Sequence, residues 1–241
     1  MKFKSIVFFL FLFAVLIKAQ DAPEVGHIAR FGGGIGFTPT FIFPNYSPLN
    51  TKLESIGFPK ISAKPIYTSG GAGYLYFLLK NVRVGAFGYG GNTSESNKIN
   101  GISNEVQYSI SNLGFSVEYT LPYFDGFGVS VGTVIGGGSI EIDLYRNSGN
   151  YDWNTLFTDV QNGTNNINKK LSVSFLTLTP TLNVDIPINR FLFFRVGTGY
   201  QFAIGDNWEV DNGLSISGVP SDLNGNGFYV QTGIFIGLVT Y

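Results

Sequence analysis

Five charged residues lie within or beside segments whose apolar and polar residues alternate. Glu118 and Asp185 come shortly before turns, whereas Arg30, Arg83 and Arg195 lie at or near the beginning of such segments. Alternation places Glu118, Asp185 and Arg195 on the polar face, and we assign Arg30 and Arg83 to it despite their glycine-rich segments. Charges inside a narrow protein interior need partners. We therefore expect an inter-strand ion-pair layer near one end of the fold, and the alternative is interfacial charges that face headgroups or water.

Few residues offer catalytic or metal-binding chemistry. The single histidine, His27, opens the first alternating segment, and no serine or acidic residue is tied to it as a catalytic pair would require. Residues 222–227 alternate oxygen-bearing side chains as a calcium loop does, but they lack the distal glutamate, and two Asn-Gly pairs favour a turn. The sequence has no cysteine. We expect no enzymatic activity, cofactor or metal.

The N-terminus has the pattern of a secretory signal peptide. Lys2 and Lys4 precede an apolar run over residues 6–17, and Ala19 offers a small residue at the cleavage site. A run of 12 residues is too short to span about 30 Å of hydrocarbon as a helix. We expect cleavage of residues 1–19, which changes the formal net charge from −1 to −4 because three lysines and no acid are lost.

The composition is unusual for a soluble domain. Charged residues make up 13% of the chain, whereas soluble domains average about 25%. Beyond the leader, no apolar run approaches the roughly 20 residues of a transmembrane helix. A mildly acidic chain without clustered lysine and arginine also argues against nucleic acid as a partner.

The mature chain alternates with a period of two, which predicts strands. Short and long connections follow one another strictly, as in outer-membrane barrels, where tight turns lie at the periplasmic rim and long loops outside. The pattern predicts one domain over residues 20–241, an all-β, eight-stranded antiparallel up-and-down transmembrane β-barrel. The expected strands are 27–43, 68–79, 82–92, 106–121, 127–146, 170–187, 190–205 and 227–241, and the long loops are 44–67, 93–105, 147–169 and 206–226.

The polar face of these strands distinguishes a membrane barrel from a soluble one. A soluble barrel should present many lysines and glutamates to water, but this face carries mostly glycine, serine, threonine and asparagine. Small residues suit the crowded interior of eight strands. The opposite face carries leucine, valine, isoleucine and aromatic residues, which suit hydrocarbon. We therefore expect the protein in the outer membrane, in contact with its lipid.

The last segment ends on an aromatic residue and resembles the C-terminal strand of bacterial outer-membrane proteins. Phe235, Gly237, Val239 and Tyr241 lie on one face of it. The chain resembles the small eight-stranded outer-membrane proteins typified by the OmpA membrane domain, OmpX and OmpW. The resemblance implies recognition of the last strand by the barrel-assembly machinery, and it rests on architecture without a diagnostic motif.

Further patterns concern the lumen and the extracellular side. Apolar residues on both faces of the first and last strands suggest an apolar upper lumen. Such a lumen could admit a hydrophobic solute, but we favour a lumen that is packed by its own side chains. Aromatic residues at the loop bases suggest an interfacial girdle or receptor contacts. We expect a monomer with a structural or adhesin-like role through four extracellular loops, with a narrow channel or carrier for small solutes as the alternative. The lumen residues are Phe37, Phe41, Ile42, Phe43, Ile234, Ile236 and Leu238, and the girdle residues are Tyr145, Tyr151, Trp153, Phe157 and Trp208.

Overall fold

The computed structural model of the chain describes residues 31–76, 79–124, 126–147, 166–189 and 191–240. The expected signal peptide, His27, Arg30, Tyr151, Trp153, Phe157 and Tyr241 lie outside the described residues. The elements are β1 (Phe31–Phe37), β2 (Thr40–Pro44), α2 (Ser47–Ser55), β3 (Ile66–Tyr76), β4 (Val82–Ile99), β5 (Ile102–Leu121), β6 (Gly128–Asn147), β7 (Ile167–Asn189), β8 (Leu192–Ile204), β9 (Trp208–Val210), β10 (Leu214–Ser215) and β11 (Gly227–Thr240).

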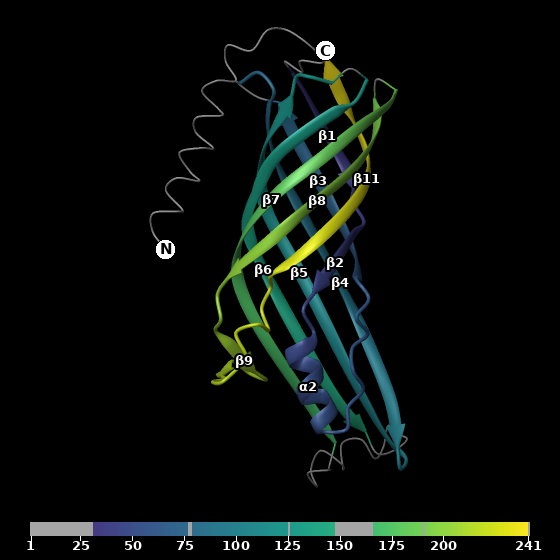
Figure 1. Cartoon of the computed structure of the whole chain (residues 1–241), viewed down its shortest axis with the longest axis vertical. Coiled ribbons are helices and arrows are strands. Elements are labelled where there is room, and N and C mark those ends of the chain that lie inside the picture. Colours follow the sequence, from purple (N-terminus) through teal and green to yellow (C-terminus); the bar gives the residue numbers. More distant parts are fainter. Residues whose placement is uncertain (1–30, 77–78, 125, 148–165, 190, 241) are drawn as a thin grey trace.

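The strands close into a ring of eight, in which every neighbouring pair is antiparallel (Figure 1). β1 and β2 together form one of the eight positions, because both lie between β11 and β3. They are separated at Pro39, which has no N–H to donate to a ladder. The ladder continues past the break, since Thr38 N donates to Gly70 O at 2.9 Å and Thr232 N donates to Pro39 O at 3.0 Å. The expected fold class is confirmed.

The strands β4, β5 and β7 are longer than the sequence pattern predicts. Residues 93–105 were expected to form a long loop, and this expectation is wrong: β4 and β5 pair from Val82 opposite Tyr119 to Ile99 opposite Ile102. The two strands are joined by Asn100 and Gly101, both of which have positive φ, as a two-residue hairpin turn requires. Polar residues on both faces of this hairpin had hidden its alternation.

The two faces of the barrel wall have the expected chemistry. Along β5, Leu113, Phe115 and Val117 are exposed on the outer face, and the residues between them are buried in the lumen. The outer apolar stretch of β5, residues 113–121, has the length of the roughly 9–11 residues that a tilted strand needs to cross a membrane. We call this apolar outer zone of the barrel the lipid belt.

The expectation of an apolar upper lumen built from the first and last strands is wrong for the described side chains. Ile234 and Ile236 are exposed on the outer face of β11, and Phe235 between them is fully buried. Phe37, Phe41 and Phe43 of β1 and β2 are likewise exposed, whereas Ile42 is buried, and the side chain of Leu238 lies outside the described residues. Because both faces of β11 are apolar, its alternation could not show which face points inward.

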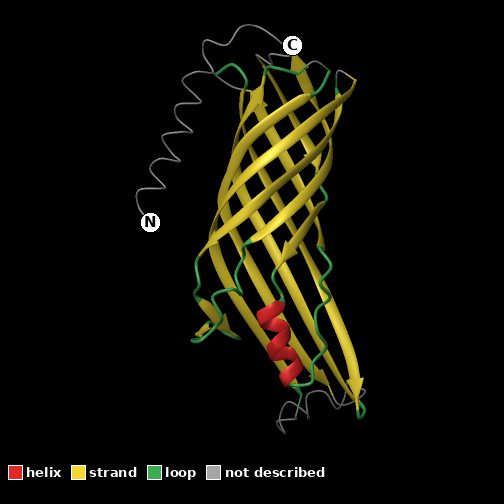
Figure 2. Cartoon of the chain, viewed as in Figure 1, coloured by secondary structure: helices red, strands yellow, loops and turns green. Residues whose placement is uncertain are grey.

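Beyond the lipid belt, β4 to β7 continue as a sheet that is covered on its inner side (Figures 1 and 2). The cover consists of α2 and the chain around it, and the small β9–β10 hairpin extends the sheet at its edge, because β9 pairs with β7. We call this assembly the head. Its apolar core includes Leu49 and Leu53 of α2 and Tyr108, Ile140 and Ile142 of the sheet. Among the described residues, no helix is long and apolar enough to cross a membrane.

Candidate functional site

Four of the five charged residues singled out in the sequence meet in the lumen. Arg83 of β4 lies directly opposite Glu118 of β5, and Asp185 of β7 lies directly opposite Arg195 of β8. All four side chains point inward near the end of the barrel where β3 joins β4, β5 joins β6 and β7 joins β8, which we call the end with short turns. We call them the ion-pair layer.

Arg83 joins the two opposed pairs across the lumen. Its guanidinium binds Glu118, with Nε 2.8 Å from Oε2, and reaches Asp185 Oδ2 from Nη1 at 2.5 Å. Arg195 binds Asp185 through Nε at 2.6 Å and Nη2 at 3.0 Å, and its Nη1 lies 3.9 Å from Glu118 Oε1. The layer therefore has two positive and two negative charges and no net charge, which is the arrangement that buried charges require.

Aromatic rings pack against the two arginines. The Arg83 guanidinium lies 4.7 Å from the centroid of the Tyr74 ring, and Arg195 lies 4.5 Å from the centroid of Phe235. Phe193 stacks on Phe235 at 5.0 Å and, with Tyr74 and Tyr76, completes a buried aromatic cluster. Cation–π contacts of this kind stabilise a desolvated guanidinium.

Polar partners of Glu118 were missed by reasoning from the sequence. Ser130 Oγ donates to Glu118 Oε2 at 3.1 Å, and Asn183 Nδ2 donates to the same oxygen at 3.2 Å. Asn183 Oδ1 in turn accepts a hydrogen bond from Gln231 Nε2 at 2.8 Å. Alternation along the strands could predict that Ser130 and Asn183 face the lumen. Their contact with Glu118 could not be predicted, because it depends on the register of β5, β6 and β7.

A second polar layer lies between the ion-pair layer and the head. Gln201 Oε1 accepts hydrogen bonds from Tyr89 Oη at 2.7 Å and from Asn112 Nδ2 at 2.6 Å. Gln201 Nε2 donates to the carbonyl of Gly225 at 2.7 Å, which ties the lumen to the chain that precedes β11. The ring of Phe87 stacks on Tyr229, both buried at this level. Side chains thus occupy the lumen from the ion-pair layer to the head core.

The head core includes one residue that was expected at the membrane interface. Trp208 was predicted to belong to an interfacial aromatic girdle, and this is wrong: it is 3% exposed and packs in the head core with Leu223 and Val173. The pairing of β9 with β7 turns Trp208 toward the inner side of the extended sheet. Tyr145 is half-buried on β6.

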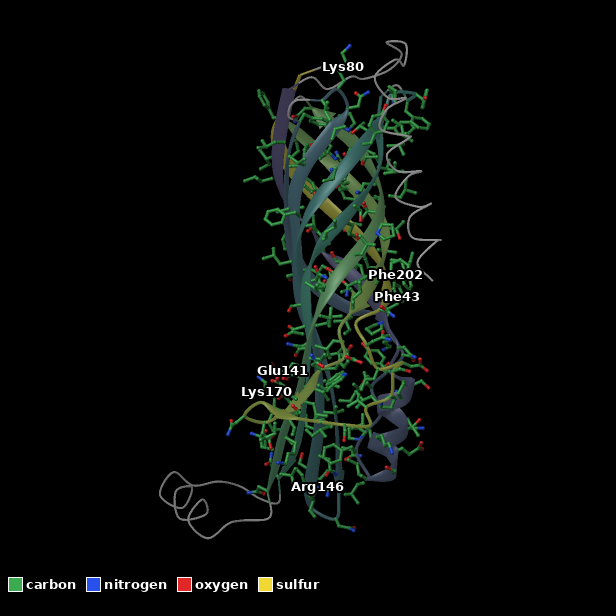
Figure 3. All side chains as sticks on the ribbon, turned by 90° about the vertical axis from the view of Figure 1, so that its left-hand side faces the viewer. Phe43, Lys80, Glu141, Arg146, Lys170 and Phe202 are labelled. Carbon is green, nitrogen blue, oxygen red and sulfur yellow. The ribbon has the colours of Figure 1, made fainter. Side chains whose placement is uncertain are left out.

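Other aromatic side chains mark the boundary of the lipid belt. Phe41 packs edge-on against Tyr67, Phe43 lies beside Phe228, and Tyr200 lies beside Phe202. All six are exposed on the outer face. In Figure 3, Phe43 and Phe202 lie between Lys80 at the end with short turns and the ion pair of Glu141 with Lys170 on the head side. This order, from apolar wall through aromatic residues to charges, is typical of a membrane boundary.

Arg146 fastens the helix of the head to the extended sheet. From the far end of β6, its Nη2 donates to the carbonyl of Ile56, the residue that follows α2, at 2.9 Å. Its Nε donates to Asn104 Oδ1 at 2.7 Å, and its guanidinium lies 5.0 Å from the centroid of the Phe58 ring. Figure 3 shows Arg146 near the outer end of the molecule.

We expect Arg146→Ala to loosen the end of α2 without affecting the barrel. The variant loses the two hydrogen bonds that the charged guanidinium donates and one cation–π contact. Each hydrogen bond that involves a charged group contributes about 1.5–3 kcal/mol. Hydrogen exchange of residues 50–58 in micelles should become at least tenfold faster. Arg146→Lys, which keeps the charge but not the planar fork, should give an intermediate rate, and unchanged exchange in Arg146→Ala would contradict the assigned role.

The C-terminal residues singled out in the sequence lie partly within the described structure. The Phe235 side chain is fully buried in the lumen, and Gly237 shares its face of β11. The side chains of Val239 and Tyr241 lie outside the described residues.

Comparison with known proteins gives likeness in structure only. No protein-family model matches the chain, and no curated protein matches it. The outer-membrane protein OprG from Pseudomonas aeruginosa is similar with a TM-score of 0.51 and 11% identity over 89% of this chain and 99% of that one. A major outer-membrane protein from Thermus thermophilus has a TM-score of 0.48 and 11% identity over 86% and 99% of the two chains. For Ail, the attachment invasion locus protein of Yersinia pestis, the TM-score is 0.43 and the identity 9% over 87% and 99%.

The closed ring, the apolar outer wall and the likeness to OprG together define the class of the protein. It is an eight-stranded β-barrel of the bacterial outer-membrane type. The barrel holds an ion-pair layer in its lumen and carries a head with its own apolar core.

Proposed function

We propose that this protein is a non-enzymatic outer-membrane barrel whose lumen is closed to solutes and whose head interacts with ligands or surfaces outside the cell. The observation that supports it best is the ion-pair layer: two arginines and two carboxylates, each at most 15% exposed, bridge the lumen from β4 to β7. A second support is the head core, which gives the extracellular end a fixed shape. Rigid scaffolds that carry exposed segments are common in recognition.

The remaining features of the proposal follow from the sequence. A leader over residues 1–19 would direct the chain through the inner membrane, and the last strand, with Phe235, Gly237, Val239 and Tyr241, would be read by the barrel-assembly machinery. We propose a monomer, because a closed ring leaves no strand edge in the lipid. Its short turns would then face the periplasm and its head the exterior.

Conductance in planar bilayers tests the closed lumen. We expect purified wild-type protein to show no steady solute flux, and Glu118→Gln to produce brief openings together with a lower stability. The substitution keeps the shape of the side chain but leaves Arg83 with one carboxylate, Asp185, which it shares with Arg195. The matched control is Glu105→Gln, because Glu105 is also on β5 but lies in the head beyond the lipid belt.

Two results would overturn the closed-lumen proposal. Clear solute flux through the wild-type barrel would favour the narrow channel instead. Glu118→Gln without effect on either conductance or stability would show that the ion-pair layer does not seal the lumen.

A further inference from the structure

A groove runs along the outer face of β3 and β4, inside the lipid belt. Two adjoining hollows of about 1190 and 590 Å³ share Ile35, Gly73 and Ala86 as lining residues. The floor is low because the outward positions of β3 and β4 carry small residues. These are Gly71, Gly73, Ala86 and Gly88.

Large apolar side chains form the two walls of the groove. On one side stand Leu113 and Phe115 of β5, which are 68% and 78% exposed. On the other side stand Ile35 of β1 and Ile236 of β11, which are 74% and 64% exposed. Neighbouring strands lie about 4.8 Å apart, so β1 and β5, which are three spacings apart, are separated by about 14 Å. The walls narrow this gap, because Ile35 leans over Gly73 and Leu113 leans over Gly88. An extended hydrocarbon chain fits in the channel that remains.

The position of the groove identifies what can fill it. Its larger hollow reaches Leu75 and Val84, which pair with each other close to the turn between β3 and β4. It is continuous with the exposed apolar surface that the barrel presents to lipid, and its outward side chains are apolar. The molecules in contact with this groove are therefore lipids of the leaflet at the end with short turns, and their acyl chains lie at its depth.

We propose that this groove holds one acyl chain of a phospholipid from the periplasmic leaflet, as a retained lipid rather than one in free exchange. Dispersion contacts from a floor and two walls surround the chain on three sides, whereas a lipid on the convex wall elsewhere meets the protein on one side. The proposal rests on the membrane position of the belt and is independent of whether the lumen is closed.

The test fills the groove and counts retained lipids. Ala86→Leu and Gly71→Leu place a branched side chain on the floor, and a Cβ at Gly71 meets only the Gly36 carbonyl, at 3.5 Å. Gly137→Leu is the matched control: Gly137 is an exposed outward glycine of β6 outside the groove, where a Cβ likewise meets only one carbonyl, that of Phe175, at 3.6 Å. The full chain is folded with phosphatidylethanolamine, transferred to detergent and analysed by native mass spectrometry.

We expect wild type and Gly137→Leu to retain one phosphatidylethanolamine, and Ala86→Leu and Gly71→Leu to retain it at least tenfold less. Migration of unheated samples on gels shows which variants are folded, and only folded variants are compared. Equal retention by all four proteins would overturn the proposal. A wild-type dimer that Ala86→Leu dissociates would also overturn it, because the groove would then bind a second copy of the chain. Neither result depends on conductance, so failure here is distinguishable from failure of the proposed function.

Discussion

Replacing Arg83 by alanine should lower the free energy of unfolding by about 3–5 kcal/mol, which is the usual cost of leaving a buried charge without its partner. Arg83 is 1% exposed and contacts both Glu118 and Asp185. Without it, the layer holds two carboxylates and only Arg195. Denaturant titration of the purified protein in micelles, followed by the loss of strand structure, measures the change.

A double replacement separates the pairing of charges from the loss of side-chain packing. Arg83→Ala with Glu118→Ala leaves Asp185 paired with Arg195 and restores neutrality, so it should cost less than the sum of the two single changes, by about 0.5–3 kcal/mol. Lys169→Ala serves as a control, because its ion pair with Asp211 lies on the exposed side of the head and exposed pairs contribute little. An Arg83→Ala midpoint close to that of Lys169→Ala would refute the structural role of the layer.

Replacing Leu53 by aspartate should open the head and leave the barrel closed. Leu53 is 1% exposed in the head core. The change removes an apolar contact worth about 2–5 kcal/mol and introduces a carboxylate that has no partner there. Because about 1.4 kcal/mol is a tenfold change in an equilibrium constant, the population of the open head should rise by a factor of at least roughly 30.

Limited proteolysis in micelles measures this change. Cleavage within residues 44–66 should become faster by about the same factor, whereas the difference in gel migration between heated and unheated protein should persist, because the barrel ladder is unaffected. Lys52→Asp is the matched control, since it places the same carboxylate one residue away on an exposed position of α2. Equal cleavage of the two variants would show that the head core does not hold α2 in place.

The architecture of the barrel wall could be predicted from the pattern of residues along the strands. Period-two alternation on most strands, with leucine and phenylalanine on one face and small polar residues on the other, is sufficient to predict a closed barrel in lipid, because no other arrangement satisfies both the side chains and the backbone there. It also placed Glu118, Asp185 and Arg195 on the inner face, since parity along a strand is a local property.

The contacts between residues of different strands could not be predicted in this way, because they depend on strand register. The register sets Arg83 opposite Glu118, and it brings Ser130 and Asn183 to the same carboxylate. The pairing of β11 with β8 places Phe235 in the lumen beside Arg195. Alternation could not predict this orientation, because both faces of β11 are apolar. The head could not be predicted from the sequence either, because its core packs α2 against strands that lie far along the chain. Which strands become neighbours depends on the closure of the ring and not on the residues of one strand.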